Sequence, residues 1–141
     1  MLFSGMTPSI PIRTFVLGGK ALFTLKSLKT GKHFTYRVNQ RSQEKPAFVS
    51  VLTGSNNEED YSFLGTIFRD GNYRHGTKSH IGSDAPSNLA FEWFWRHADR
   101  LPADQVEFCH CGKCAVCGRT LTTPDSLALG IGPECAKRAG V

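Results

Sequence analysis

Hydrophobic and polar residues alternate along the stretch GGKALFTLKSLKTGKHFTYRVNQ, which covers residues 18–40. An alternation with a period of two is typical of strands that rest one face on a core. Because glycine readily adopts the positive φ of a tight reversal, the stretch predicts two antiparallel strands around a turn at Thr30 and Gly31. If the loop consists of those two residues, Leu25 faces Tyr36.

This register sorts the side chains of the two strands by face. One face is apolar and carries Phe23, Leu25, Phe34, Tyr36 and Val38. The other face is polar and basic and carries Thr24, Lys26, His33, Thr35 and Arg37. We therefore expect the first face to lie on the core and the second to stay open.

Four further stretches complete the predicted fold. The runs AFVSVLT (47–53) and YSFLGTIF (61–68) predict two more strands, whereas the polar, Gly-punctuated residues 69–86 predict a loop. The run PSNLAFEWFWRHADRLP has apolar residues at helical spacing, with Ser87 as its cap and Pro102 as its stop. The sequence thus predicts an α+β fold, in which an antiparallel sheet of about four strands is covered by one helix.

The cysteines are concentrated near one end of the chain. Four of the five lie within the 26 residues from His110 to Cys135. A disulfide framework normally uses an even number of cysteines in an oxidising compartment, so this odd and crowded set favours metal binding. We expect residues 1–104 to form the α+β domain and residues 105–141 to form a zinc-binding module.

Spacing identifies three metal ligands. Cys114 and Cys117 form the motif Cys-x2-Cys-Gly-Arg, in which two thiolates hold one zinc ion and Gly118 permits the tight turn. Cys135 follows the residues GIGPE, where Pro133 indicates the first position of a short helix. A thiolate pair on a turn, followed by a ligand at the start of a helix, is the layout of a treble-clef zinc site.

The fourth ligand has to come from the upstream residues Cys-His-Cys. His110 gives His-x3-Cys-x2-Cys-x17-Cys and leaves enough chain to fold back on the metal. Cys111 instead crowds three ligands onto a seven-residue loop. We therefore prefer the ligand set His110, Cys114, Cys117 and Cys135, with Cys111 as the alternative to His110 and the role of Cys109 left open.

The whole segment from residue 110 to residue 138 also carries a family pattern. Its elements are a histidine before Cys-x2-Cys-Gly-Arg, then Leu-Thr, Pro-x-Ser and Gly-x-Gly-Pro-x-Cys. They correspond to His110, Cys114, Cys117, Gly118, Arg119, Leu121, Thr122, Pro124, Ser126, Gly130, Gly132, Pro133 and Cys135. On these positions the segment resembles a small zinc-binding domain of unknown function that occurs in phage, plasmid and bacterial proteins. The resemblance implies a treble-clef fold and a metal, but no activity.

The predicted shell of three cysteines and one histidine indicates a structural zinc. A catalytic zinc keeps an open position for water and usually has a general base nearby. The deaminase pattern His-x-Glu is missing, since Gly112 stands two residues after His110. The residues VLGGKAL do not form a phosphate-binding loop either, because the Ser or Thr after Lys20 is absent. We therefore expect a binding protein and no enzymatic activity.

Positive charge is concentrated in the first part of the chain. The net charge is +5, but residues 1–57 hold eight Lys and Arg against one acid, whereas the remainder holds nine against eleven. Such an asymmetry favours a polyanionic partner. We expect nucleic acid to bind the open sheet face and the hairpin tip, through Lys26, Lys29, Lys32, His33 and Arg37.

A second hypothesis comes from a different class of protein. A small phage-encoded inhibitor could occupy a host defence or regulatory protein, and this idea rests on the chain's size and on the resemblance to mobile-element proteins. The start of the chain does not look like a signal peptide, because it carries Pro8 and Pro11 and no uninterrupted apolar run. We expect a cytoplasmic protein that does not enter the membrane.

Overall fold

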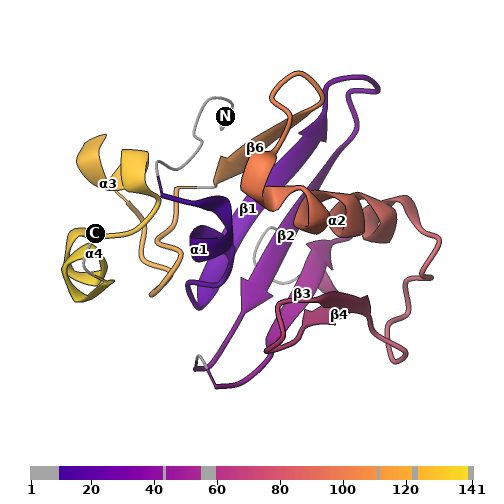
Figure 1. Ribbon diagram of the computed structural model, residues 1–141, viewed down its shortest axis with the longest axis horizontal. Coiled ribbons are helices and arrows are strands. Elements are labelled where there is room, and N and C mark those ends of the chain that lie inside the picture. Colours follow the sequence, from indigo (N-terminus) through magenta and orange to yellow (C-terminus); the bar gives the residue numbers. More distant parts are fainter. Residues whose placement is uncertain (1–9, 43, 55–59, 111, 122–123, 140–141) are drawn as a thin grey trace.

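The computed structural model describes residues 10–42, 44–54, 60–110, 112–121 and 124–139. Within them, six strands form one antiparallel sheet in the order β5-β4-β3-β2-β1-β6 (Figure 1). The strands are β1 (Lys20–Ser27), β2 (His33–Asn39), β3 (Ala47–Leu52), β4 (Tyr61–Ile67), β5 (Tyr73–His75) and β6 (Val106–His110). The helical elements are α1 (Ile12–Val16), α2 (Pro86–Arg96), the 3₁₀ turn η1 (Ala98–Arg100), α3 (Pro124–Leu129) and α4 (Pro133–Ala139). None of the helices in this part of the chain has the length and apolar character needed to cross a membrane.

The α+β class and the antiparallel sheet are confirmed, but the predicted number of strands is wrong. β5 lies in the segment predicted as a loop, and its three residues are too few to show an alternation. β6 is the edge strand beside β1, although its residues fall in the range predicted for the zinc module. The cover is also more than one helix, because α1 packs against the sheet as well.

The predicted hairpin of β1 and β2 is confirmed, but its register is wrong by two residues. Leu25 pairs with Phe34 instead of Tyr36. The loop is longer than two residues, because the amide of Ser27 donates to the carbonyl of Lys32 at 2.8 Å. A shift of two residues preserves the period of a strand, so every side chain keeps its predicted face.

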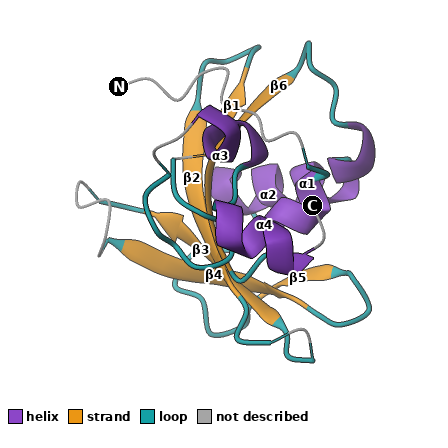
Figure 2. Cartoon of the chain, turned by 90° about the vertical axis from the view of Figure 1, so that its left-hand side faces the viewer, coloured by secondary structure: helices purple, strands orange, loops and turns teal. Residues whose placement is uncertain are grey.

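Aromatic side chains fill the space between the sheet and the two helices that cover it. The ring of Phe94, on α2, lies 5.6 Å from the ring of Phe23 on β1 and 5.6 Å from that of Phe108 on β6. Tyr36 is fully buried, and its hydroxyl donates to the carbonyl of Ser87 at 2.7 Å. α1 and α2 thus lie on the same side of the sheet (Figures 1 and 2).

α2 begins differently from the prediction. Pro86 occupies the first turn, and Ser87 is buried inside the helix instead of capping it. Of the two tryptophans, Trp95 is 4% exposed and its indole N–H donates to the carbonyl of Gly71 at 2.8 Å. Trp93 is half-buried and stacks on His97 with ring centroids 4.4 Å apart. The helix therefore places one tryptophan in the core and leaves the other beside a surface pocket.

Candidate metal centre

The candidate metal centre begins on a short hairpin that follows β6. An isolated bridge pairs Lys113 with Thr120, and the ammonium of Lys113 donates to the hydroxyl of Thr120 at 2.9 Å. Between them, Gly118 has a φ of +80°, which glycine adopts without strain. Its amide donates to the carbonyl of Cys114 at 2.9 Å. The hairpin therefore bends the Cys-x2-Cys segment into a tight loop.

The third cysteine approaches this loop from the last helix. Cys135 lies in the first turn of α4, two residues after Pro133. Gly130, with a φ of +82°, follows the end of α3, and its carbonyl accepts a hydrogen bond from the amide of Ala115 at 3.0 Å. The turn between the two helices is thus tied to the cysteine loop.

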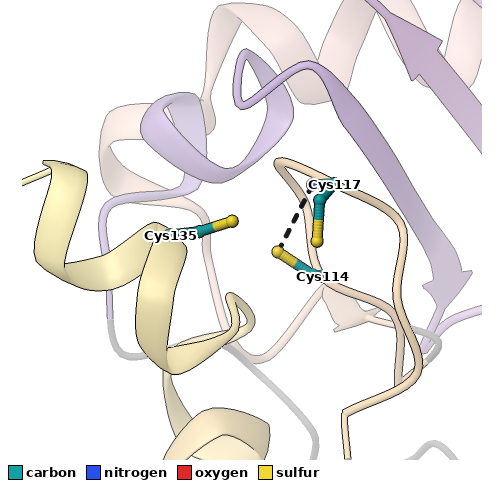
Figure 3. A group of neighbouring side chains, drawn as sticks. All are labelled: Cys114, Cys117 and Cys135. Carbon is teal, nitrogen blue, oxygen red and sulfur yellow. Dashed lines mark hydrogen bonds between the residues drawn. The ribbon is translucent and has the colours of Figure 1, made fainter.

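The sulfur atoms of Cys114, Cys117 and Cys135 lie within 4.8 Å of one another. Figure 3 shows the side chains of Cys114 and Cys117, from the loop, converging with that of Cys135 from α4. In a tetrahedral zinc site with Zn–S bonds of about 2.3 Å, sulfurs lie about 3.8 Å apart. Small side-chain movements would therefore bring the three sulfurs to that spacing. Three sulfur ligands in this arrangement can hold a metal ion.

Backbone amides point at the sulfur of Cys114. It accepts from Gly132 at 3.2 Å and from Val116 and Cys117 at 3.4 Å each. Burial raises the pKa of this thiol, but the three N–H donors, together with a hydrogen bond from the side chain of Cys117, outweigh burial and bring the pKa to about 7. Cys114 is thus prepared to bind a metal as a thiolate.

The pKa of the Cys135 thiol is shifted in the opposite direction. Its burial raises its pKa to about 11, with further contributions from hydrogen bonds to the other two cysteines and from their negative charge. Three thiolates this close together repel one another. A divalent cation removes that repulsion, which is why such a cluster favours a bound metal.

His110, the predicted fourth ligand, is not part of the group of converging ligand atoms. Its side chain is fully buried, with its ring 6.0 Å from that of Phe15. One ring nitrogen donates to the carbonyl of Leu127 at 2.7 Å, and the other accepts from the amide of Gly112 at 3.0 Å. Burial lowers its pKa, which favours this neutral form. His110 therefore joins β6 to α3 and to the hairpin, and its role as a metal ligand stays a prediction.

The two remaining cysteines are Cys109 and Cys111. Cys109 is buried in β6, opposite Thr24 of β1. Cys111, the alternative fourth ligand, lies outside the described residues. Among the described residues, the sulfurs of Cys114, Cys117 and Cys135 are the group whose ligand atoms converge.

The cysteine loop is docked on the beginning of β1. The amide of Lys20 donates to the carbonyl of Ala115 at 2.6 Å. A Cβ at Gly18 would lie 2.9 Å from that same carbonyl oxygen, so only glycine allows this approach without displacement. The sequence offered no signal for this contact, because its partners are nearly a hundred positions apart.

The predicted nucleic-acid residues occupy two places. Lys26, His33 and Arg37 lie on the face of the sheet opposite α2. Lys29 and Lys32 lie at the hairpin tip, where they line a pocket against α2. The five residues therefore do not form one surface.

The open face also carries aromatic residues that sequence reasoning missed. The guanidinium of Arg37 lies 4.3 Å from the ring centre of Tyr61. Phe48 is 50% exposed, and its ring meets that of Phe63 edge to face at 6.3 Å. The signal was present in the alternation of β3 and β4, which places these rings on the same face as Arg37.

The architecture is thus an α+β layer with a candidate three-cysteine metal centre beside it. Residues 104–140, about a quarter of the chain, match the model of a family described as "Family of unknown function (DUF6011)". No curated protein and no solved structure matches the chain. The match covers β6 and the whole candidate centre, and it leaves the function of both open.

Proposed function

We propose that the protein binds nucleic acid through the open face of its sheet and that its C-terminal part is a treble-clef module built around a structural zinc ion. The zinc assignment is supported by the donor set, because soft thiolates select zinc or iron–sulfur chemistry over magnesium and calcium. The hairpin with Cys114 and Cys117, followed by α4 with Cys135, has the order of elements of a treble clef. When bound, zinc would link the hairpin to α4 and supply folding energy.

The observation that carries the nucleic-acid proposal is the pairing of cations with aromatic rings on the open face. Lys26 and His33 are exposed there, and Arg37 lies over Tyr61. Cations attract phosphates, and aromatic faces stack on bases, so the two together suit a flexible nucleic-acid strand. Glu107 of β6 lies opposite Lys26 and would limit the basic surface at that edge.

The test is a double variant on this face, Lys26→Ala with Arg37→Ala. We expect it to weaken binding of labelled DNA or RNA oligonucleotides and to reduce the slope of log affinity against log salt by about 0.7 per lost phosphate contact for a single strand, or about 0.9 for a duplex. Fluorescence anisotropy at several salt concentrations measures both quantities.

The matched control is Arg96→Ala with Arg100→Ala. It removes the same charge from exposed positions on α2 and η1, away from the open face. Equal binding by the two double variants, with melting temperatures like that of the parent protein, would contradict the assignment of this face.

One observation favours the second candidate, an inhibitor that binds a host protein. A mainly apolar pocket of about 250 Å³ lies between the hairpin tip and α2, lined by Leu25, Phe34 and Trp93 among others. Two exposed leucines, Leu28 and Leu89, belong to the neighbouring loop and to α2. A pocket of this kind suits an apolar side chain of a protein partner.

A further inference from the structure

A wide groove lies where the sheet meets the cysteine loop. It has a volume of about 790 Å³ and is enclosed by the start of β1, the end of β2 with the loop after it, the start of β3 and the cysteine loop. Its wall includes Lys20, Asn39, Arg41, Lys45, Phe48 and Val116. The groove is distinct from the residues that the sequence predicted for nucleic acid.

The residues that line the groove carry positive charge. Lys20, Arg41 and Lys45 are all exposed, and none of the residues that line the groove is acidic. The ion pairs of Arg13 with Asp99 and of Arg74 with Asp70 both lie outside the groove. Three cations that converge on one concavity attract an anion, and a phosphate group is the anion that Arg and Lys recognise best.

The shape of the groove is held by backbone contacts on both sides. The amide of Gln40 donates to the carbonyl of Gly19, and its side-chain amide donates to the carbonyl of Lys45 at 2.8 Å. Gly19 has a φ of +122°, and a Cβ there would lie 3.3 Å from the carbonyl oxygen of Val116. These contacts hold the backbone at Gln40 and Lys45 beside the start of β1, which places the side chains of Arg41 and Lys45 on the same wall of the groove.

Phe48 joins the groove to the open face of the sheet. Its ring is half-exposed, lines the groove and meets Phe63 on the open face. Lys20 pairs with Asn39, and Asn39 pairs with Phe48, so the Cα atoms of Lys20 and Phe48 lie two strand spacings apart, about 10 Å, with both side chains on the same face of the sheet. At this separation a single nucleotide can meet the cation with its phosphate and the ring with its base.

We propose that this groove holds a backbone phosphate of a single-stranded nucleic acid while Phe48 stacks on the adjoining base. The proposal rests on the proposed function and makes it specific, because a base can stack on Phe48 only when it is not paired within a duplex. The strand would run from the groove over Phe48 and Phe63 towards Arg37. Since Val116 belongs to the cysteine loop, the metal centre would support one wall of the site.

The experiment compares Phe48→Leu with Phe48→Tyr in the metal-loaded full-length protein. The probes are a fluorescein-labelled 12-nucleotide single-stranded DNA, the RNA of the same sequence, and the DNA duplex. We expect Phe48→Leu to weaken single-strand binding by about 5- to 150-fold with little change in the salt slope, and Phe48→Tyr to retain binding. Arg41→Ala with Lys45→Ala should instead lower the salt slope by about 1.4.

The matched control is Phe68→Leu. Phe68 is also an exposed aromatic, at 40%, but it lies outside the groove after β4. We expect Phe68→Leu to leave the affinity for the single strand unchanged. Because Phe48 and Phe68 are exposed, both variants should keep the melting temperature of the parent protein.

Three results would overturn the inference. If Phe48→Leu and Arg41→Ala with Lys45→Ala bind like the parent protein, while Lys26→Ala with Arg37→Ala does not, the groove proposal fails and the proposed function stands. If the duplex binds as tightly as the single strand, stacking on Phe48 is excluded. If the parent protein binds none of the probes at 50 mM salt, both proposals fail together.

Discussion

The sheet with its covering helices is stabilised by different forces from those that stabilise the C-terminal module, residues 112–139. The sheet and its helices bury whole aromatic side chains, among them Phe15, Phe23, Tyr36, Phe91 and Phe94, all fully buried. Among the described side chains of residues 112–137, the larger apolar ones that are buried are Leu121 and Ile131. Burial stabilises by roughly 25 cal/mol per Å² of apolar surface, so these side chains contribute less than the aromatic core of the sheet, against which they pack.

The difference in buried apolar side chains indicates that the cysteines take the place of a large core in the module. A short segment without a core needs a disulfide, a metal or a neighbour to fold. Here the neighbour is β1, through Lys20 and Gly18, and the metal would be held by three converging thiols. The sheet, in contrast, should fold without the metal. Three experiments test this contrast, and the largest expected effect comes first.

Metal removal should affect the two regions unequally. Structural zinc contributes about 10–16 kcal/mol of apparent binding energy, which exceeds what a small module can lose and stay folded. We expect a chelator to abolish hydrogen-exchange protection in residues 112–139, while amides of β1 to β4 stay protected. Exchange measured by mass spectrometry, with and without added zinc, gives the answer. Protection that is lost uniformly along the chain would show that the two regions fold as one unit.

Truncation in the aromatic core should act on the sheet instead. Phe94→Ala removes a ring that contacts Phe23, Phe91 and Phe108, and we expect a loss of about 3–5 kcal/mol in the free energy of unfolding. Chemical denaturation of the metal-loaded protein measures it. Leu89→Ala, on the same helix but 51% exposed, should cost less than about 0.5 kcal/mol. Similar losses in the two variants would mean that α2 is not packed as described.

A variant of His110 tests whether this residue binds the metal or only joins the sheet to the module through hydrogen bonds. Its two ring nitrogens bond to the backbone of Gly112 and Leu127, so His110→Gln should lower the stability of the module by about 1–3 kcal/mol. Because His110 is not among the converging ligand atoms, we expect cobalt bound to His110→Gln in place of zinc to keep its tetrahedral absorption and its stoichiometry. Cys114→Ser is the comparison variant that should lose both. If His110→Gln loses the tetrahedral absorption, His110 is the fourth ligand, as the spacing predicts.

The alternation of residues predicted much of the sheet, because a period of two survives errors of register. The hairpin of β1 and β2 was predicted with the wrong pairing, yet Phe23 and Tyr36 are on the core face as expected. β5 and β6 were missed, since strands of three and five residues carry too little pattern to separate them from loops. Their place is decided by neighbouring strands with unpaired edges.

The candidate centre was predicted in part for a similar reason. Cys-x2-Cys is a local motif, and the glycine and proline before Cys135 mark a helix start, so both could be recognised from spacing. The environment of His110 could not, because it depends on contacts with Leu127 and Phe15, which lie far from it in the sequence. A buried histidine that is hydrogen-bonded to a backbone carbonyl and a backbone amide has the same local sequence as one that is bound to a metal.

The sequence by itself determined the fold class, the basic character of the first half and the three cysteines that converge, because each depends on period, composition or short spacing. Only the tertiary structure decided which cations share a surface. Lys26 and Lys29 are neighbours in the sequence but lie on different sides of the hairpin, whereas Lys20, Lys45 and Val116 meet in one groove. The physical reason is that strand pairing and loop docking bring together residues whose separation along the chain carries no signal of their contact.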